Sequence, residues 1–207
     1  GLPSSYHVAG TADYNGDGHA DILWRTDTGQ DVMWMMNGGQ IVGNADLMTL
    51  PSSYHVAATA DFNGDGHADI LWRTDGGQNV MWLMNGGQIV GNADLIGLPQ
   101  DWHVAGTADF NGDGHADILW RTDTGQDVMW MMNGGQIVGN ADLMGLPSSY
   151  HVAGTADYNG DGHADILWRT DSGQDVMWMM NGGQIIGNAD LPGIGAPWHI
   201  VNDHALI

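Results

Sequence analysis

The chain has 207 residues and no cysteine, and its 25 acidic residues against four arginines give a formal net charge of −21. A surface with this charge repels phosphate, so we expect neither nucleic-acid binding nor binding to anionic membranes. Apolar residues make up 43% of the chain and ten residues are tryptophan, which excludes disorder and predicts a packed core.

A unit of 48 residues occurs four times in succession. In the first unit, short apolar stretches alternate with turn residues, and Asn37-Gly38-Gly39 is typical of a tight hairpin. A longer loop containing Pro51 leads to the next unit. The pattern predicts four strands per unit, which in the first unit cover residues 6–12, 20–25, 30–36 and 40–45.

Four short antiparallel strands in a repeat of 40–50 residues are typical of a β-propeller blade. We therefore predict an all-β fold, a single β-propeller domain over residues 1–207. The apolar side chains expected to pack between blades are Ile22, Trp24, Val32, Trp34, Ile41 and Leu47. The predicted blades are about 1–48, 49–96, 97–144 and 145–192, and an incomplete fifth start predicts one extra terminal strand at 198–207.

One segment of nine residues, Asp-Tyr-Asn-Gly-Asp-Gly-His-Ala-Asp at 13–21, returns almost unchanged in every unit. It places side-chain oxygens at positions 1, 3, 5 and 9, a glycine at position 6 and a backbone carbonyl at position 7. Ca²⁺ takes six to eight oxygen ligands, and glycine permits the bend that gathers them. The predicted ligands of about four Ca²⁺ ions are Asp13, Asn15, Asp17, His19, Asp21, Asp61, Asn63, Asp65, His67, Asp69, Asp109, Asn111, Asp113, His115, Asp117, Asp157, Asn159, Asp161, His163 and Asp165, each histidine through its carbonyl.

The alternative for this segment is an aspartate-rich and asparagine-rich turn that binds no metal. An EF-hand is excluded, because its loop needs glutamate at position 12, where this chain has Trp24, and the chain contains no glutamate. Four Ca²⁺ ions would add eight positive charges and bring the formal charge from −21 to −13. We therefore expect chelation of calcium to lower stability.

The run Ala-Asp-Tyr-Asn-Gly-Asp-Gly-His-Ala-Asp-Ile-Leu-Trp-Arg at 12–25 resembles FG-GAP and VCBS-type repeats. These are the calcium-loop propeller blades of integrin α-subunit heads, of fungal and bacterial lectins and of secreted bacterial proteins. The resemblance covers about residues 1–191 and implies that Asp13, Asn15, Asp17, Asp21 and their equivalents are calcium ligands. The segment 199–204 lacks the Asn-Gly-Asp-Gly turn, so we assign it no ion.

Closure of the propeller has three solutions at this stage. The extra strand can pack outside a four-bladed ring, two chains can pool eight blades and exchange terminal strands, or the chain can be a piece of a longer propeller. Because an exposed blade edge invites pairing, we include a homo-oligomer formed through terminal strands among the expected partners.

For function, we expect a non-enzymatic binding module that recognises a carbohydrate or mediates adhesion, because repeated blades present several weak sites that together give avidity. The alternative is a symmetric repeat scaffold, natural or engineered, with no ligand beyond calcium. An enzyme is not expected: the chain has no cysteine or lysine, and its clustered aspartates are assigned to metal. Arg25 is expected to pair with Asp27 or Asp31, and His7 to be a packed strand-edge residue.

The expected location is secreted, because extracellular calcium modules are weak sites and the surface is acidic and free of thiols. No signal peptide is visible at the start of this sequence. No run of 18 apolar residues occurs, so membrane insertion is not expected.

Overall fold

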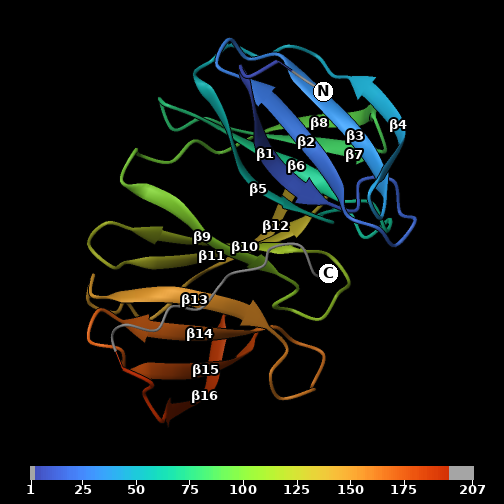
Figure 1. Ribbon diagram of the computed structural model, residues 1–207. Helices are drawn as coiled ribbons and strands as arrows, with labels where there is room; N and C mark the ends of the chain where they lie inside the picture. Colours follow the sequence, from blue (N-terminus) through green and yellow to red (C-terminus); the bar gives the residue numbers. More distant parts are fainter. Residues whose placement is uncertain (1–2, 196–207) are drawn as a thin grey trace. The chain divides into compact units, whose positions relative to one another are not determined.

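The computed structural model describes residues 3–195, which fold into sixteen β-strands (Figure 1). They form four antiparallel sheets of four strands, and in each sheet the strand order follows the chain. The extra strand predicted at 198–207 lies outside the described residues. The strands are β1 (Tyr6–Ala12), β2 (Asp21–Thr26), β3 (Asp31–Asn37), β4 (Gln40–Asp46), β5 (Tyr54–Ala60), β6 (Asp69–Thr74), β7 (Asn79–Asn85), β8 (Gln88–Leu95), β9 (Trp102–Ala108), β10 (Asp117–Thr122), β11 (Asp127–Asn133), β12 (Gln136–Asp142), β13 (Tyr150–Ala156), β14 (Asp165–Thr170), β15 (Asp175–Asn181) and β16 (Gln184–Leu191).

These sheets confirm the predicted all-β propeller of four repeated blades. We call them blade 1 (β1–β4), blade 2 (β5–β8), blade 3 (β9–β12) and blade 4 (β13–β16). The chain divides into two compact units, and blades 1 and 2 make up most of the first, blades 3 and 4 most of the second. In the part of the chain that the structure describes, no helix has the length and apolar character needed to cross a membrane.

Two tryptophans recur at the same positions of each repeat, and the strand register places both on one face of the blade. Ile22 lies opposite Trp34 and Trp24 lies opposite Val32 in the β2–β3 pair. The Trp24 and Trp34 rings meet edge to face with centroids 5.1 Å apart, and the same pair recurs at 5.0 or 5.1 Å in the other three blades. Aromatic pairs in this geometry add to the stability gained from their buried area.

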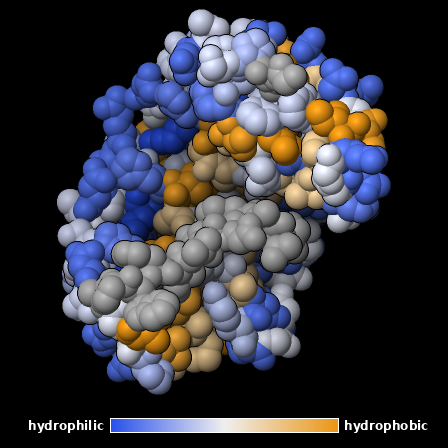
Figure 2. Space-filling view, in the orientation of Figure 1, coloured by the Kyte–Doolittle hydropathy of each residue, from blue (hydrophilic) through white to orange (hydrophobic). Residues whose placement is uncertain are grey.

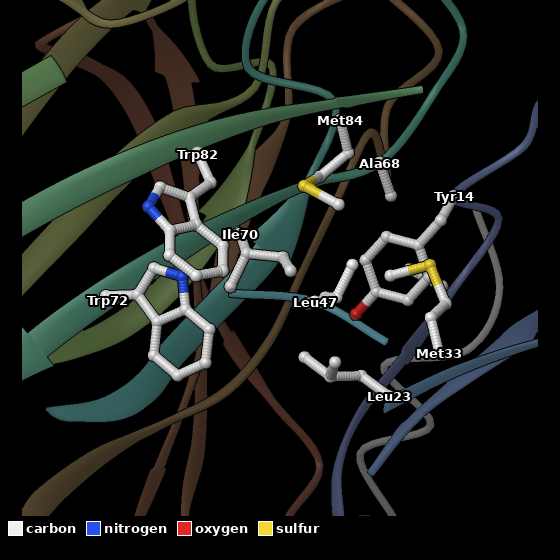
Figure 3. Close-up of a cluster of buried hydrophobic side chains, with 10 residues drawn as sticks. Tyr14, Leu23, Met33, Leu47, Ala68, Ile70, Trp72, Trp82 and Met84 are labelled. Carbon is white, nitrogen blue, oxygen red and sulfur yellow. The ribbon is translucent and has the colours of Figure 1, made fainter. Parts of the chain in front are cut away.

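Within each unit, the two blades pack face to face. We call the face that a blade turns toward the following repeat its distal face, and the opposite one its proximal face. In the first unit, the distal face of blade 1 meets the proximal face of blade 2 (Figure 3). Burying each such side chain stabilises the fold by about 1.5–3 kcal/mol. The distal side chains are Tyr14, Leu23, Met33 and Leu47, the proximal ones Ile70, Trp72, Trp82 and Met84, and all are at most 8% exposed.

The second unit repeats this packing with equivalent residues. Phe110, Leu119 and Met129 of blade 3 share a cluster with side chains of blade 4, namely Ile166, Trp168, Trp178 and Met180. Each of these seven side chains is at most 1% exposed. The predicted inter-blade role of the tryptophan positions is therefore confirmed for both units, and methionine side chains share these clusters.

One part of the predicted core is wrong for blade 1. Ile41 was expected between blades, but it is 51% exposed. Ile22, Trp24 and Trp34 are only half-buried. The reason is that these residues lie on the proximal face of blade 1, whereas blade 2 packs on the distal face of that blade.

In each unit, the arginine of the first blade ties it to the second blade. Arg25 Nη1 donates to Asp31 Oδ2 at 2.6 Å, and Nη2 donates to the Pro51 carbonyl at 2.9 Å in the crossover loop. The guanidinium also lies over the Trp72 ring of blade 2, 4.9 Å from its centroid. This confirms the structural pairing of Arg25, with Asp31 as its partner. Arg121 makes the same contacts with Asp127, Pro147 and Trp168 in the second unit.

The second repeat replaces the aspartate of this ion pair with asparagine. Asn79 Oδ1 accepts from Arg73 Nη1 at 2.9 Å, and its Nδ2 donates to the Ile96 carbonyl at 2.8 Å. In the first repeat, Asp31 Oδ1 is buried without a hydrogen-bond partner. Burial raises the pKa of Asp31 to about 6 although the Arg25 side chain opposes the shift. The neutral form of residue 31 is thus the one that its surroundings favour.

We predict that Asp31→Asn changes how stability depends on pH. The folded pKa of Asp31 lies above its unfolded value of about 3.9, so its contribution is fully present below about pH 4 and is lost as the pH rises to about 6. Asparagine stays neutral and can donate as Asn79 does, so the variant should be about 1–3 kcal/mol more stable than the wild type near pH 7 and equal to it near pH 4. Urea unfolding at both pH values measures this difference.

The matched control is Asp46→Asn, which removes the same charge from an exposed residue and should shift stability little at either pH. A variant Asp31→Asn that is less stable than the wild type near pH 7 would mean that the Arg25–Asp31 ion pair outweighs the cost of burying it.

Candidate functional site

The nine-residue loop predicted to bind calcium connects the first and second strands of each blade. In blade 1 it folds around the Asp13 carboxylate. Oδ1 accepts from Gly16 N at 2.7 Å and Asp17 N at 3.2 Å, and Oδ2 accepts from Gly18 N at 2.7 Å. The bend depends on Gly16 and Gly18, whose φ values of +72° and +83° are costly for any residue with a Cβ. The glycines in the motif are thus explained by backbone conformation.

The next two predicted ligands continue the same turn. Asn15 Oδ1 accepts from Asp17 N at 2.9 Å, and Asp17 Oδ1 accepts from His19 N at 2.9 Å. The His19 ring lies against the same carboxylate, with Nδ1 at 3.0 Å from Asp17 Oδ1. The hydrogen bond from His19 N lowers the pKa of Asp17, and the bond from Gly162 N does the same for Asp157. These loop hydrogen bonds therefore favour the charged form of Asp17 and Asp157.

The fourth predicted side chain, Asp21, lies at the base of the loop and is fully buried. Its Oδ2 accepts from Tyr14 N at 3.1 Å, and its Oδ1 accepts from Met36 N at 2.8 Å. Burial raises the pKa of Asp69 and of Asp117 to about 7. The same two bonds recur in each blade, from Phe62 and Met84 to Asp69, from Phe110 and Met132 to Asp117, and from Tyr158 and Met180 to Asp165.

Asp21 and its equivalents thus fasten the loop to the end of the third strand of each blade, which is β3, β7, β11 or β15. Reasoning from the sequence assigned them only to metal and missed this role. The available signal was their position, because each is the first residue of a strand and directly precedes an apolar run. Whether they also bind an ion stays a prediction.

The loop residues fit calcium in the chemistry of their donors. Asp13, Asn15 and Asp17 lie around one bend and offer only hard oxygens, and a carboxylate oxygen that accepts one N–H keeps a second lone pair. Over residues 3–195, however, no three histidine or acidic side chains form a group ready to hold a metal ion. Binding would therefore require these oxygens to be shared between the loop amides and the ion.

The loops also connect neighbouring blades. In the first unit, Ala68 N donates to the Asp13 carbonyl at 2.8 Å, and Gly86 N donates to the Tyr14 carbonyl at 2.6 Å. In the second unit, Ala164 N and Gly182 N make the same bonds to the carbonyls of Asp109 and Phe110. A change in the conformation of the loop would therefore also change the contact between the two blades.

A second repeated feature lies at the opposite end of the first strand. His55 Nε2 is 2.7 Å from Asp75 Oδ1, and the two side chains are 61% and 69% exposed. The half-buried Tyr54 precedes this histidine, and Trp102 takes its place in blade 3. The expectation that His7 is packed is wrong, because its side chain is 55% exposed. The equivalent pairs are His103–Asp123 at 2.9 Å, His151–Asp171 at 2.8 Å and His7–Asp27 at 3.7 Å.

The comparison with protein families identifies these repeats. The family described as FG-GAP-like repeat matches residues 13–72, 61–120 and 109–168, which together cover more than half of the chain. Each match begins at one aspartate-rich loop and ends at the tryptophan that follows the next such loop. The family match therefore has the same period as the structural repeat. No curated protein matches the chain at a significant level.

Similar solved structures share the fold. They include the β-propeller domain of Cps50 (Swd1) from Myceliophteria thermophila, with 13% identity and a TM-score of 0.53, over 93% of this chain and 57% of that one. The WD40 domain of SCAP from fission yeast has 12% identity and a TM-score of 0.51, over 94% and 44%. The Neurospora crassa Pan2 WD40 domain has 13% identity and a TM-score of 0.51, over 91% and 51%. The chain therefore spans about half the length of these propellers.

We predict that Asp69→Ala destabilises the protein whether or not calcium is present. The substitution leaves the amides of Phe62 and Met84 without their acceptor in a buried position. Each such loss costs about 1–3 kcal/mol, so a decrease of roughly 2–5 kcal/mol in the free energy of unfolding is expected. Guanidinium chloride unfolding with and without EDTA measures it.

Asp94→Ala is the control, because Asp94 is an exposed aspartate on β8 of the same blade. If EDTA removes the difference between Asp69→Ala and the wild type, Asp69 acts only as a ligand and the fastening role is wrong.

Proposed function

We propose, since the chain belongs to the FG-GAP-like repeat family, that it is a non-enzymatic binding module stabilised by calcium, with carbohydrate as its ligand. The repeat propeller fold supports the coarser part of this proposal, a binding or scaffold module. The ligand and the ion are the finer part, and they are argued from side chains.

The observation that carries the carbohydrate proposal is the exposed His–Asp pair next to an aromatic residue in every repeat. His55 and Asp75 offer an exposed hydrogen-bond donor and acceptor, and the preceding residue, Tyr54, is half-buried and packs against the core cluster of the first unit. Sugars present hydroxyl groups around an apolar ring face, which such a set of groups complements. Because each blade carries the same set, weak single sites can combine into strong multivalent binding.

The non-enzymatic part rests on the similarity of the repeats. A catalytic site requires groups with distinct roles, so it normally breaks the symmetry between repeats. The differences in this chain, such as Trp102 for tyrosine, Asn79 for aspartate and Gly76 for threonine or serine, create no unique polar cluster.

A symmetric scaffold with no ligand beyond calcium is the second candidate. It is favoured by the observation that the repeats are near-identical on every face, including the loops and the arginine contacts between blades. Such a protein would display its His–Asp pairs as ordinary solvated surface.

For calcium, the residues that would hold the ion are Asp13, Asn15 and Asp17 with the His19 carbonyl, together with Asp21 where it is released from its amides. The same holds for the equivalents in the other loops. The ion would supply positive charge to a cluster of carboxylates that otherwise repel one another. An extracellular location is part of the proposal, because calcium loops of this weak type need the millimolar calcium found there.

We predict that calcium raises the stability of the protein and that the loops are responsible. For a dissociation constant of about 10⁻⁴–10⁻³ M, a hundredfold excess of calcium adds about 2.7 kcal/mol for each site it fills. Thermal unfolding in calcium, in magnesium and in EDTA measures this, and titration calorimetry counts the sites. The double variant Asp17→Ala, Asp65→Ala should lose about half of the gain.

The control for that variant is Asp46→Ala with Asp94→Ala, which removes two exposed charges outside the loops and should keep the full gain. Unfolding temperatures that are equal in calcium and in EDTA would contradict calcium binding. The loop would then be a turn that binds no metal.

We predict that the protein binds a subset of glycans on an array and that the His–Asp pairs carry the binding. The triple variant His55→Ala, His103→Ala, His151→Ala removes one group from three sites and should lower the apparent affinity roughly 10²-fold or more, because avidity multiplies the losses. The matched control is Gln88→Ala, Gln136→Ala, Gln184→Ala, which changes three exposed residues on the outer strands. Absence of binding to every glycan with calcium present would favour the scaffold.

A further inference from the structure

The aspartate-rich loops of the two blades in one unit contact each other. In the first unit, Ala68 N of the blade 2 loop donates to the Asp13 carbonyl of the blade 1 loop at 2.8 Å. In the second unit, Ala164 N makes the same bond to the Asp109 carbonyl, also at 2.8 Å. Asp13 and Asp109 stand at position 1 of their loops, where the first calcium ligand is expected. The second loop of a unit is therefore bonded to the residue that begins the first.

This hydrogen bond comes from a peptide group that faces both loops. The Ala68 N–H shares one planar peptide with the His67 carbonyl, which is the expected position-7 ligand of the second loop. No peptide bond of the described residues is cis, so this carbonyl points away from the N–H that bonds to Asp13. The N–H donates more strongly when its own carbonyl is coordinated by a cation, because the peptide group is then polarised. One rigid group thus links a ligand of the second loop to a ligand residue of the first.

The histidine ring of the second loop lies against the bend of the first. A Cβ added to Gly16 would be 3.0 Å from the His67 ring. His67 Nδ1 is also 3.0 Å from Oδ1 of Asp65, an expected ligand of its own loop. The contact recurs in the second unit, where a Cβ added to Gly112 would be 2.8 Å from the His163 ring. The ring therefore lies between a carboxylate of one loop and the glycine bend of the other.

A hairpin of the second blade holds the next residue of the first loop. Gly86 N donates to the Tyr14 carbonyl at 2.6 Å, and Gly182 N donates to the Phe110 carbonyl at 2.6 Å. Positions 1 and 2 of the first loop are thus both bonded to the second blade. The remainder of the bend, at residues 16–20, is exposed. Hydrophilic side chains gather at this end of the sheet β1–β4 in Figure 2, so a cation can reach the loop from solvent.

We propose that the two loops of one unit bind calcium cooperatively, so that an ion in one loop raises the affinity of the other loop for a second ion. The proposal rests on the proposed function, because it concerns the same calcium loops. Ion binding by the second loop fixes the His67 carbonyl and the Asp65 carboxylate, and with them the peptide and the ring that hold the first loop. The coupling is reciprocal, since each loop changes the affinity of the other by the same factor.

Calorimetric titration of the full chain with Ca²⁺ tests the coupling. The background variant Asp113→Ala, Asp161→Ala removes one ligand from each loop of the second unit, so that the loops of the first unit are measured alone. Adding Asp65→Ala leaves only the first loop intact, and adding Asp17→Ala instead leaves only the second. We expect the overall constant for both ions in the background variant to exceed the product of the two single-loop constants by about fivefold or more. Circular dichroism confirms that the variants fold.

His67→Ala in the same background tests the contribution of the ring. The substitution keeps the backbone carbonyl but removes the ring that lies against Gly16, so the excess over the product of single-loop constants should fall. His55→Ala is the matched control, because it removes a histidine ring from the same blade outside the loop, where the side chain is 61% exposed. It should leave the coupling unchanged. A coupling that His67→Ala does not reduce would still support the proposal and would assign the coupling to the peptide group.

The outcomes separate this proposal from the calcium proposal on which it rests. An overall constant equal to the product of the single-loop constants would overturn the coupling and leave calcium binding intact. Absence of any heat of calcium binding, in the wild type as well as in the variants, would overturn both.

Discussion

The fold depends on the packing of unlike faces between successive blades. One four-stranded sheet has two sides, and a single repeat cannot cover both of them. Here Tyr14, Leu23 and Met33 cover Ile70, Trp72 and Met84, and the identical or similar residues do so again between blades 3 and 4. Because the two sides are complementary to each other and not to themselves, the chain gains stability only by stacking repeats in one direction. The loop, the arginine and the hairpin tip all serve that contact.

Negative charge is the opposing constraint. The formal charge of −21 acts against any compact state, and much of it is concentrated in four loops. Backbone amides offset part of this cost: they surround Asp13 and Asp17, and two further amides bond to the buried Asp21. Asp21 lies beneath the loop and not on its surface, which explains why its environment favours the protonated form while the surroundings of Asp17 favour the charged one.

The strands, the turns and the four blades could be predicted from the sequence because they depend on local patterns: alternation, paired glycines and a fixed period. The bend of the loop followed from Gly18 at position 6, whereas the positive φ of Gly16 was found only in the structure. Three features could not be predicted. The spacing of the motif predicts that Asp21 is a metal ligand, and only the fold shows that the Met36 amide lies beside it. The sequence pattern predicts that His7 is packed at a strand edge, and only the fold shows that its side chain is exposed. Trp24 and Trp72 have identical local sequences, and their burial differs because blade 1 packs over Trp72, whereas blade 2 packs on the face of blade 1 that lies away from Trp24.

The loops and the blade contacts are linked through the same backbone atoms. Asp13 contributes its side chain to the interior of the loop and its carbonyl to the Ala68 amide of the next blade. An ion bound to the carboxylates would therefore fix the residue whose carbonyl holds the neighbouring blade.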